Sequence, residues 1–382
     1  MEEFSFSVPQ NIVAGKGTIK KLPEVAAKLG GKKAFIISGP HLNKIGAVAA
    51  CEALLAEAGI QAAAFTDCEA NPSVETVDKA TAQFKESGAD FIVAYGGGSP
   101  MDVAKAVGVL AKFGGSITEY EGAHKVPGDI VPLIAIPTTA GTGSEVTAFS
   151  VITDHSRQYK LTVFSYKLLP AYAILDADLI TTVPAPTAAA CGMDALIHAL
   201  EAYISTAASP FSDAMAEKAM ELIGGNIRRY VANRTDTQAA QAMLVGSLFA
   251  GIAFSFARLG NVHAMSHPVS AHFNVAHGVA NAILLPTIVD YNALADHGKY
   301  RKIYNYIAQL PLGADEFESF MLADEIRDLN DILGIPASLS EVGVKEDAIP
   351  AMAADAMKSG NIAVNPRSSK LEDIEMLYRK AM

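Results

Sequence analysis

Residues 90–106 read DFIVAYGGGSPMDVAKA, an apolar run followed by glycines and then by a helix-forming segment. The run 91–95 predicts a buried strand, and the glycines allow a tight turn. Ser99 can cap the helix that follows, and Pro100 suits its first turn. A helix that begins at the end of a parallel strand offers N–H groups to an anion such as a phosphate. The cluster is not the G-x-G-x-x-G fingerprint, so a phosphate site and a plain turn both remain open.

The same order of elements is repeated on both sides of this segment. Further β-rich runs that predict strands lie at 32–38 (KKAFIIS), 60–67 (IQAAAFTD) and 131–137 (VPLIAIP). Stretches with helical periodicity lie at 47–59, 73–89 and 100–114. Strands that alternate with helices at this spacing are typical of a parallel sheet covered by helices. The sequence therefore predicts an α/β dinucleotide-binding domain over residues 1–182.

The second half of the chain has a different composition. Runs of β-branched residues become rare, and Ala-, Leu- and Met-rich stretches with helical periodicity dominate, at 184–207, 210–231, 237–258 and 262–271. The boundary is expected within ILDADLITTVPAP, because Pro184 and Pro186 frame the entry to the helices. Residues 183–382 are therefore predicted to form an all-helical domain.

Composition limits the partners. Half of the 382 residues are hydrophobic, the formal net charge is -11, and the chain has no long basic run. These features argue against nucleic acid or an anionic membrane as a partner. The apolar stretches are too short for a membrane span, and the three cysteines form no C-x-x-C pair. Since the start has no signal-peptide pattern, we expect a cytoplasmic protein.

A second loop follows a strand at 137–145, PTTAGTGSE. It offers the hydroxyl groups of Thr138, Thr139, Thr142 and Ser144, with glycines between them. Two such loops after strands of one sheet fit a dinucleotide that lies across the strand ends.

Histidines gather at 260–278, GNVHAMSHPVSAHFNVAHG, which holds His263, His267, His272 and His277. Earlier, GMDALIHALEAY (192–203) places Asp194 and His198 four residues apart on one helix face. One carboxylate and two or three imidazoles from separate helices predict a divalent cation site, with ligands that suit Fe(II) or Zn(II). A single helical histidine is more often a packing residue, which is our interpretation of His272.

In their order and spacing, several segments together resemble the iron-containing (group III) alcohol dehydrogenases over nearly the whole chain. They are GGGSPMDVAKA, AIPTTAGTGSEVT, AILDADL, GMDALIHALEAY and GNVHAMSHPVSAHFNVAHGVANAILLP. The likeness is greatest to the branch with lactaldehyde reductase and 1,3-propanediol dehydrogenase. The resemblance implies the dehydroquinate synthase-like fold, with an active site in the cleft between a nucleotide domain and a helical domain. It also implies NAD(P)(H)-dependent interconversion of alcohols and aldehydes by a homodimer or larger homo-oligomer.

Residue by residue, the resemblance implies three sets of functional positions. The metal ligands fall on Asp194, His198, His263 and His277, and a further active-site histidine, which handles the proton, falls on His267. The cofactor contacts fall on Gly97, Gly98, Ser99, Thr138, Thr139, Thr142, Lys160 and Leu179. A further cofactor position is Gly39, where the family often has an aspartate that faces the adenosine ribose. Without that carboxylate NAD selectivity is open, and NADP is a possible cofactor.

A second departure from the family concerns the substrate. FSFARLG places Phe256 and Arg258 where small or amide residues are expected, shortly before His263. A salt-bridged arginine is one interpretation, and an arginine that binds an anionic substrate group is the other. With the second interpretation, Phe149, Phe254 and Arg258 are candidate substrate contacts for a short aldehyde of the sulfoacetaldehyde or succinic semialdehyde type.

Other functions stay open beside this one. The alternatives are a neutral short-chain alcohol or diol dehydrogenase, a glycerol dehydrogenase-like zinc enzyme, and a dehydroquinate synthase-like lyase. A non-catalytic metal or nucleotide binding protein is disfavoured by the completeness of the ligand set.

Overall fold

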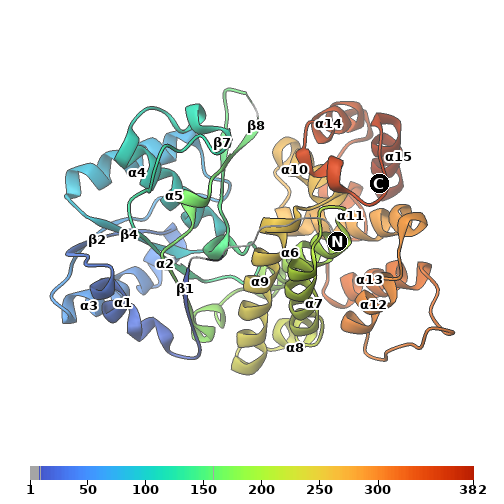
Figure 1. Ribbon diagram of the computed structural model, residues 1–382, viewed down its shortest axis with the longest axis horizontal. Coiled ribbons are helices and arrows are strands. Elements are labelled where there is room, and N and C mark those ends of the chain that lie inside the picture. The colour runs from blue at the N-terminus through green and yellow to red at the C-terminus, as the bar shows by residue number, and fades with distance from the viewer. Residues whose placement is uncertain (1–7, 9, 158) are drawn as a thin grey trace. The chain divides into compact units, whose positions relative to one another are not determined.

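The structure, a computed structural model, describes residues 8, 10–157 and 159–382 (Figure 1). The chain divides into two compact units. The first comprises Val8–Thr139 and Ser144–Ile180, and the second comprises Thr181–Met382 together with the short segment Ala140–Gly143.

The first unit is built on a six-stranded parallel sheet in the order β1-β9-β6-β4-β2-β3. Its strands are β1 (Asn11–Ala14), β2 (Lys33–Ile37), β3 (Gln61–Phe65), β4 (Phe91–Gly96), β6 (Leu133–Pro137) and β9 (Tyr172–Leu175). After the edge strand β3, the chain returns to pair β4 with the other side of β2. The strand order therefore reverses at β2, and such a switch point opens a crevice at the carboxyl ends of β2 and β4.

Helices cover both faces of this sheet, as Figure 1 shows. They are α1 (Leu22–Lys28), α2 (Pro40–Lys44), α3 (Ala47–Glu57), α4 (Val74–Ser87) and α5 (Gly98–Phe113). Alternate residues of β2 enter different cores: Phe35 packs in the cluster with α4 and α5, and Ile36 in the cluster with α1 and α3. A strand buried on both faces reads as a continuous apolar run. The α/β fold class predicted from the sequence is confirmed.

A small second sheet was not predicted. It has the order β5-β8-β7, from β5 (Gly122–Ala123), β7 (Phe149–Asp154) and β8 (Tyr159–Phe164). β7 and β8 pair antiparallel. Sequence patterning missed them because the segment between them is charged and polar, and because the buried face of β7 carries Ser150 and Asp154 beside Ile152, so that apolar residues do not alternate.

The second unit is helical. Its helices are α6 (Ala185–Ile204), α7 (Pro210–Gly224), α8 (Ile227–Ala232), α9 (Thr237–Ala257), α10 (Asn261–Phe273), α11 (His277–Asn292), α12 (Tyr300–Ile307), α13 (Phe320–Ile332), α14 (Ile349–Ala356) and α15 (Leu371–Ala381). The single helix expected at 210–231 is two helices, α7 and α8, which meet at Gly225 and Asn226. The expectation that every apolar stretch is too short for a membrane span is wrong for α9, which is long and apolar enough to cross one. Among the described residues, 67% of its apolar window is buried, as in the core helix of a globular unit.

Short 3-10 helices complete both units: η1 (Thr18–Lys21), η2 (Ile117–Tyr120), η3 (Ser144–Val146), η4 (Tyr166–Leu168), η5 (Ala177–Ile180), η6 (Ala293–Ala295), η7 (Ser340–Val342), η8 (Glu346–Ala348) and η9 (Gly360–Val364).

Candidate active site

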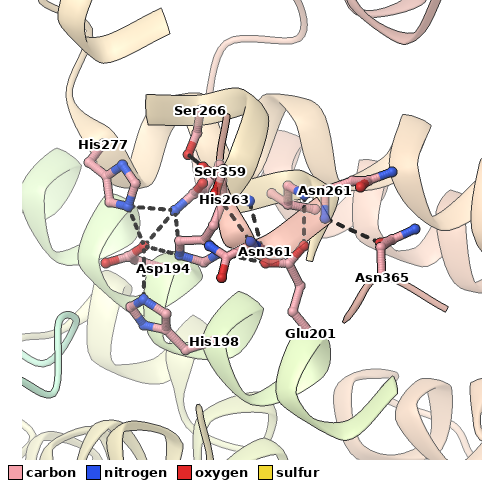
Figure 2. Close-up of polar contacts among 12 residues, drawn as sticks. Asp194, His198, Glu201, Asn261, His263, Ser266, His277, Ser359, Asn361 and Asn365 are labelled. Atoms are coloured by element: carbon pink, nitrogen blue, oxygen red, sulfur yellow. Dashed lines mark hydrogen bonds and ion pairs between the residues drawn. The ribbon is translucent and has the colours of Figure 1, made fainter. Parts of the chain in front are cut away.

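Three helices of the second unit bring one carboxylate and three imidazoles together. Asp194 and His198 lie one turn apart on α6, His263 lies on α10, and His277 begins α11. The Nε2 atoms of His263, His277 and His198 lie 3.6, 3.7 and 4.0 Å from Asp194 Oδ1. Figure 2 shows the three rings around this carboxylate. The side chains singled out in the sequence therefore converge on one point.

A glycine brings α11 close enough for this geometry. A Cβ atom on Gly278 would overlap the backbone carbonyl of Ala190 on α6. A larger residue would push the start of α11, and with it His277, away from Asp194. The glycine that follows His277 in the sequence is therefore explained by the close approach of two helices.

The donor set fits a divalent cation. Asp194 Oδ1 and one nitrogen each of His263 and His277 all lie within 4.8 Å of one another. Ligands that share one cation at about 2.0–2.2 Å stand roughly 3–4 Å apart. Three imidazole nitrogens and one carboxylate oxygen are a common set for Fe(II) and Zn(II). His198 lies outside this group of three, with its Nε2 4.0 Å from Asp194 Oδ1.

The electrostatics of the cluster also favour a positive charge. Burial lowers the pKa of His198 to about 4, so its ring stays neutral. Burial works against charge on His263 too, but the hydrogen-bonded carboxylates of Asp194 and Glu201 outweigh it and raise its pKa to about 9. A position that holds a proton this strongly is suited to hold a metal ion in its place.

Glu201 is a site residue that the sequence reasoning missed. Its Oε2 lies 2.6 Å from His263 Nδ1, its Oε1 accepts a hydrogen bond of 2.7 Å from the N–H of Val262, and only 2% of the residue is exposed. A carboxylate behind a ligating imidazole fixes the tautomer and directs Nε2 towards the ion. The signal in the sequence is its spacing of seven from Asp194, which keeps both on one helix face.

Asn281 is a second residue that was missed. It lies one turn after His277 on α11 and is fully buried. Its Nδ2 lies 2.7 Å from Asp194 Oδ1 and 3.1 Å from the Nε2 atoms of both His263 and His277. The spacing of four from His277 could have drawn attention to it.

His267 lies beside the cluster without entering it. Its half-buried ring stands 5.2 Å from the His277 ring and 6.3 Å from the His263 ring, measured between centroids. The family resemblance implies a role for His267 that is distinct from that of the ligands, and this role stays a prediction.

The candidate substrate residues fall in both units. In the second unit, the ring of Phe254 stacks on His198 with centroids 4.5 Å apart, whereas Phe256 packs against Phe211. Residues two apart on a helix point in nearly opposite directions, so Phe256 does not share the surroundings of Phe254. In the first unit, Phe149 stacks on Phe164 at 4.7 Å.

Arg258 ends α9 in a backbone conformation that is rare for a residue with a side chain, at φ 62° and ψ -169°. This region is populated almost only by glycine and costs roughly 1–3 kcal/mol for other residues. The side chain is exposed, and its guanidinium lies against Gly360. Within the described part of the chain no carboxylate forms an ion pair with it, which removes support from the salt-bridge interpretation.

The candidate cofactor residues of the first unit cluster at the carboxyl ends of neighbouring strands. Gly39 follows β2, Gly97, Gly98 and Ser99 follow β4, and Thr138 and Thr139 follow β6. The N–H of Thr138 donates to the carbonyl of Gly96 at 2.9 Å, which ties the two loops together. A Cβ atom on Gly97 would stand 3.2 Å from Thr139 Oγ1, so the loops lie side by side.

The prediction that Ser99 caps α5 is wrong. Gly97 is the N-cap, the helix begins at Gly98, and no side chain caps it. The glycines let the chain turn two residues earlier than the serine suggested. The N–H groups of the first turn are therefore left for another acceptor.

The remaining cofactor candidates are spread more widely. Lys160 on β8 donates to Asn71 Oδ1 at 2.8 Å, and Leu179 in η5 packs against the core between the sheet and α1 and α3. Thr142 lies in the segment Ala140–Gly143, which belongs to the second unit. There, a Cβ on Gly143 would stand 2.8 Å from the backbone of Gly251 on α9, so the segment packs tightly against the helices.

Lys105 supports the loop that carries these threonines. Its fully buried ammonium donates to Ser144 Oγ at 2.9 Å and to the carbonyls of Thr147 and Phe149 at 2.9 and 2.7 Å. Burial lowers the pKa of Lys105 to about 8. The residue fastens the end of the loop to α5 and was not singled out in the sequence, because lysine is rarely buried.

Comparison with known proteins agrees with the resemblance found in the motifs. The iron-containing alcohol dehydrogenase model matches residues 9–177, and that of the C-terminal part of the Fe-containing family matches residues 188–382. The chain is 39% identical over 381 residues to 1,3-propanediol dehydrogenase of Citrobacter freundii, covering 99% of this chain and 98% of that protein. It is 38% identical over 371 residues to lactaldehyde reductase of Escherichia coli K12, covering 96% of each.

A solved structure extends the likeness to the fold. Sulfoacetaldehyde reductase from Bifidobacterium kashiwanohense, solved in complex with NAD+, superposes with a TM-score of 0.90 at 29% identity, covering 100% of this chain and 99% of that one. Both predictions, the fold and the branch of the family, are confirmed. The chain therefore belongs to the iron-containing alcohol dehydrogenase family and is an NAD(P)-dependent oxidoreductase that acts on alcohols and aldehydes.

Proposed function

We propose that the protein interconverts a small primary alcohol and its aldehyde with NAD(H), using one divalent cation, Fe(II) or Zn(II), held by Asp194, His198, His263 and His277. The convergence of three imidazole Nε2 atoms on Asp194 Oδ1, at 3.6–4.0 Å, carries the proposal. A bound cation would polarise the carbonyl oxygen of the substrate, and the nicotinamide would supply the hydride. We also propose a homodimer or larger assembly, which light scattering would test.

The chain's own residues have separate tasks in this proposal. Glu201 keeps the Nε2 of His263 directed towards the ion, and Phe254 shields one face of His198 from water. His267, beside the cluster, passes the alcohol proton towards solvent, a task suited to an imidazole near neutral pH. Consumption of NADH by short aldehydes, on enzyme loaded with Fe(II) or Zn(II), tests the whole proposal.

For the cofactor, we propose that the first unit, within residues 1–182, binds the dinucleotide, and that residues 183–382 hold the metal and the catalytic groups. The pyrophosphate would lie at the start of α5, whose first turn has no side-chain cap. Gly98, Ser99 and the Thr138–Thr139 pair would border it. Lys160, Leu179 and Thr142 are further candidate contacts.

The Gly39→Asp variant is expected to increase the preference for NAD(H) over NADP(H) by about tenfold or more. Gly39 lies at the end of β2, and a carboxylate there would accept from the ribose hydroxyls and repel a 2′-phosphate. A charge-assisted hydrogen bond of about 1.5–3 kcal/mol corresponds to this range. The measurement is the ratio of kcat/KM for the two cofactors.

Gly39→Ala is the matched control, because a Cβ at this position stands 3.2 Å from the carbonyl of Cys68 and shifts the loop slightly in either variant. The ratio should be unchanged in Gly39→Ala. An unchanged ratio in Gly39→Asp as well would show that this position does not face the ribose.

For the substrate, we propose a short aldehyde of about two to four carbons with an anionic tail, such as sulfoacetaldehyde or succinic semialdehyde. The support is Arg258, an exposed arginine at the end of α9. One turn earlier on α9, Phe254 stacks on the ring of His198. A guanidinium fork matches a carboxylate or sulfonate. That a related fold serves a sulfoacetaldehyde reductase is in line with this proposal.

The Arg258→Ala variant is expected to lose a roughly ten- to a hundredfold preference in kcat/KM for anionic over neutral aldehydes. Neutral aldehydes such as propanal should be converted at nearly the wild-type rate. The control is Arg379→Ala, which removes an exposed arginine of α15 that pairs with Glu375. If the wild type prefers lactaldehyde, propanal or 3-hydroxypropanal to every anionic aldehyde, the enzyme is a neutral short-chain alcohol or diol dehydrogenase.

A further inference from the structure

Two residues that are far apart in the sequence, Arg258 and Gly360, fit together at the end of α9. The backbone of Arg258, at φ 62° and ψ -169°, lies in a region populated almost only by glycine. Gly360 begins η9, and a Cβ atom built on it would stand 2.2 Å from Arg258 Nη2. An arginine therefore occupies a backbone position that favours glycine, and a glycine leaves the space that its guanidinium fills.

The backbone of Arg258 is held on both sides by residues of the candidate active site. Its N–H donates to the carbonyl of Phe254 at 2.8 Å, and the Phe254 ring stacks on His198. On the other side, Glu201 accepts a hydrogen bond of 2.7 Å from the N–H of Val262. A strained conformation persists where its surroundings fix it in this way, and such residues gather at ligand sites.

The segment under the guanidinium is anchored as well. Ser359 caps η9 by accepting from the N–H of Asn361 at 3.3 Å. At the other end of η9, the carbonyl of Val364 accepts from the N–H of Thr206 at 2.9 Å. Gly360 is thus part of a fixed surface, and the guanidinium that lies against it has a defined place.

This place leaves the charge of Arg258 available. The side chain is exposed, and no carboxylate of the described chain forms an ion pair with it. The contact with Gly360 depends on the missing side chain, because a Cβ there would overlap Nη2. The overlap falls on the far end of a flexible side chain, so an alanine at 360 would displace the guanidinium and leave the fold intact.

We propose that Gly360 is a positioning residue for substrate selection: together with the strained backbone of Arg258, it directs the guanidinium to the anionic tail of the aldehyde. The inference rests on the proposed anionic substrate. It goes beyond that proposal because it assigns part of the selectivity to a residue that has no side chain and carries no charge.

The test compares kcat/KM for sulfoacetaldehyde and propanal in the metal-loaded enzyme. Gly360→Ala is expected to lose about ten- to a hundredfold of the preference for the anionic aldehyde, although Arg258 is still present. The loss should appear in the KM for sulfoacetaldehyde rather than in kcat. In a double-mutant cycle, Arg258→Gly combined with Gly360→Ala should lose no more than Arg258→Gly alone, because both changes remove the same interaction.

A second readout does not depend on turnover. Ethanesulfonate, an unreactive anion, should raise the thermal unfolding temperature of the wild type in the presence of NADH and should raise that of Gly360→Ala less. Arg258→Gly should unfold at a higher temperature than the wild type, because glycine adopts the backbone conformation at position 258 without strain. A less stable Arg258→Gly would show that Arg258 serves the fold and would overturn the inference.

Gly313→Ala is the matched control. Gly313 is an exposed glycine in the loop between α12 and α13, and a Cβ there would meet only the end of the Glu316 side chain, at 3.1 Å. Its substrate preference should equal that of the wild type. A Gly360→Ala variant that keeps the preference would refute the inference alone, as would one that raises the KM for NADH instead, because the guanidinium would then face the cofactor. A wild type without any preference for sulfoacetaldehyde would overturn the proposed substrate and this inference with it.

Discussion

The His263→Ala variant is expected to lose its bound metal and its dehydrogenase activity together. His263 stands between two carboxylates, with Nε2 3.6 Å from Asp194 Oδ1 and Nδ1 2.6 Å from Glu201 Oε2. Removing a ligand opens the coordination sphere and leaves Glu201 nothing to orient. Removal of a residue that hydrogen-bonds to a metal ligand already costs about 10–100-fold in metal affinity. Removal of the ligand itself should therefore cost more than about a hundredfold.

Metal content of the purified variant and its rate of NADH oxidation measure the two losses. His272→Ala is the matched control on the same helix, since His272 faces Asp355 at 3.0 Å and lies outside the cluster. Because His263→Ala also leaves a buried Glu201 without its imidazole, the unfolding temperature should be recorded, and His263→Gln retains a hydrogen-bonding group. Full activity of the variant, or of the wild type in the presence of a chelator, would contradict the proposed metal site.

The fold could be predicted well where the local pattern and the tertiary structure agree. The runs around β2, β4 and β6 are apolar on both faces, and the helices between them have a clear period. The pattern failed where a long-range contact decides. The β7–β8 pair depends on its partners rather than on an apolar alternation of its own, and the start of α5 depends on a turn in which Gly96 adopts a positive φ of 157°.

The candidate site could be predicted only in part, for a related reason. Spacing placed Asp194 with His198 on one helix, and with the later histidines it already predicted a cation site. The choice of His263 and His277 as the further ligands, with His267 apart from them, came from the family resemblance. Glu201 and Asn281 escaped because a polar residue on a helix is normally a surface residue. Only their burial, at 2% and 0% exposed, distinguishes them, and burial is a property of the packed helices.

The His267→Ala variant is expected to keep its metal and lose turnover, whereas His263→Ala is expected to lose both. The His267 ring lies outside the ligand cluster and next to His277, 5.2 Å away between centroids. A half-buried imidazole beside the reacting centre can carry a proton between the substrate oxygen and solvent. Removal of a positioned proton carrier costs about 10²–10⁴-fold in rate, which should appear in kcat rather than in metal content.

Three measurements separate this role from a structural one. Metal content should match the wild type, the limb of the pH–rate profile that depends on the imidazole should disappear, and added imidazole should restore part of the rate. His272→Ala should leave all three unchanged, since it removes a ring from the same helix at a distance from the cluster. Loss of bound metal in His267→Ala would mean that His267 is itself a ligand. A wild-type rate with an unaltered pH profile would mean that the proton leaves by another route.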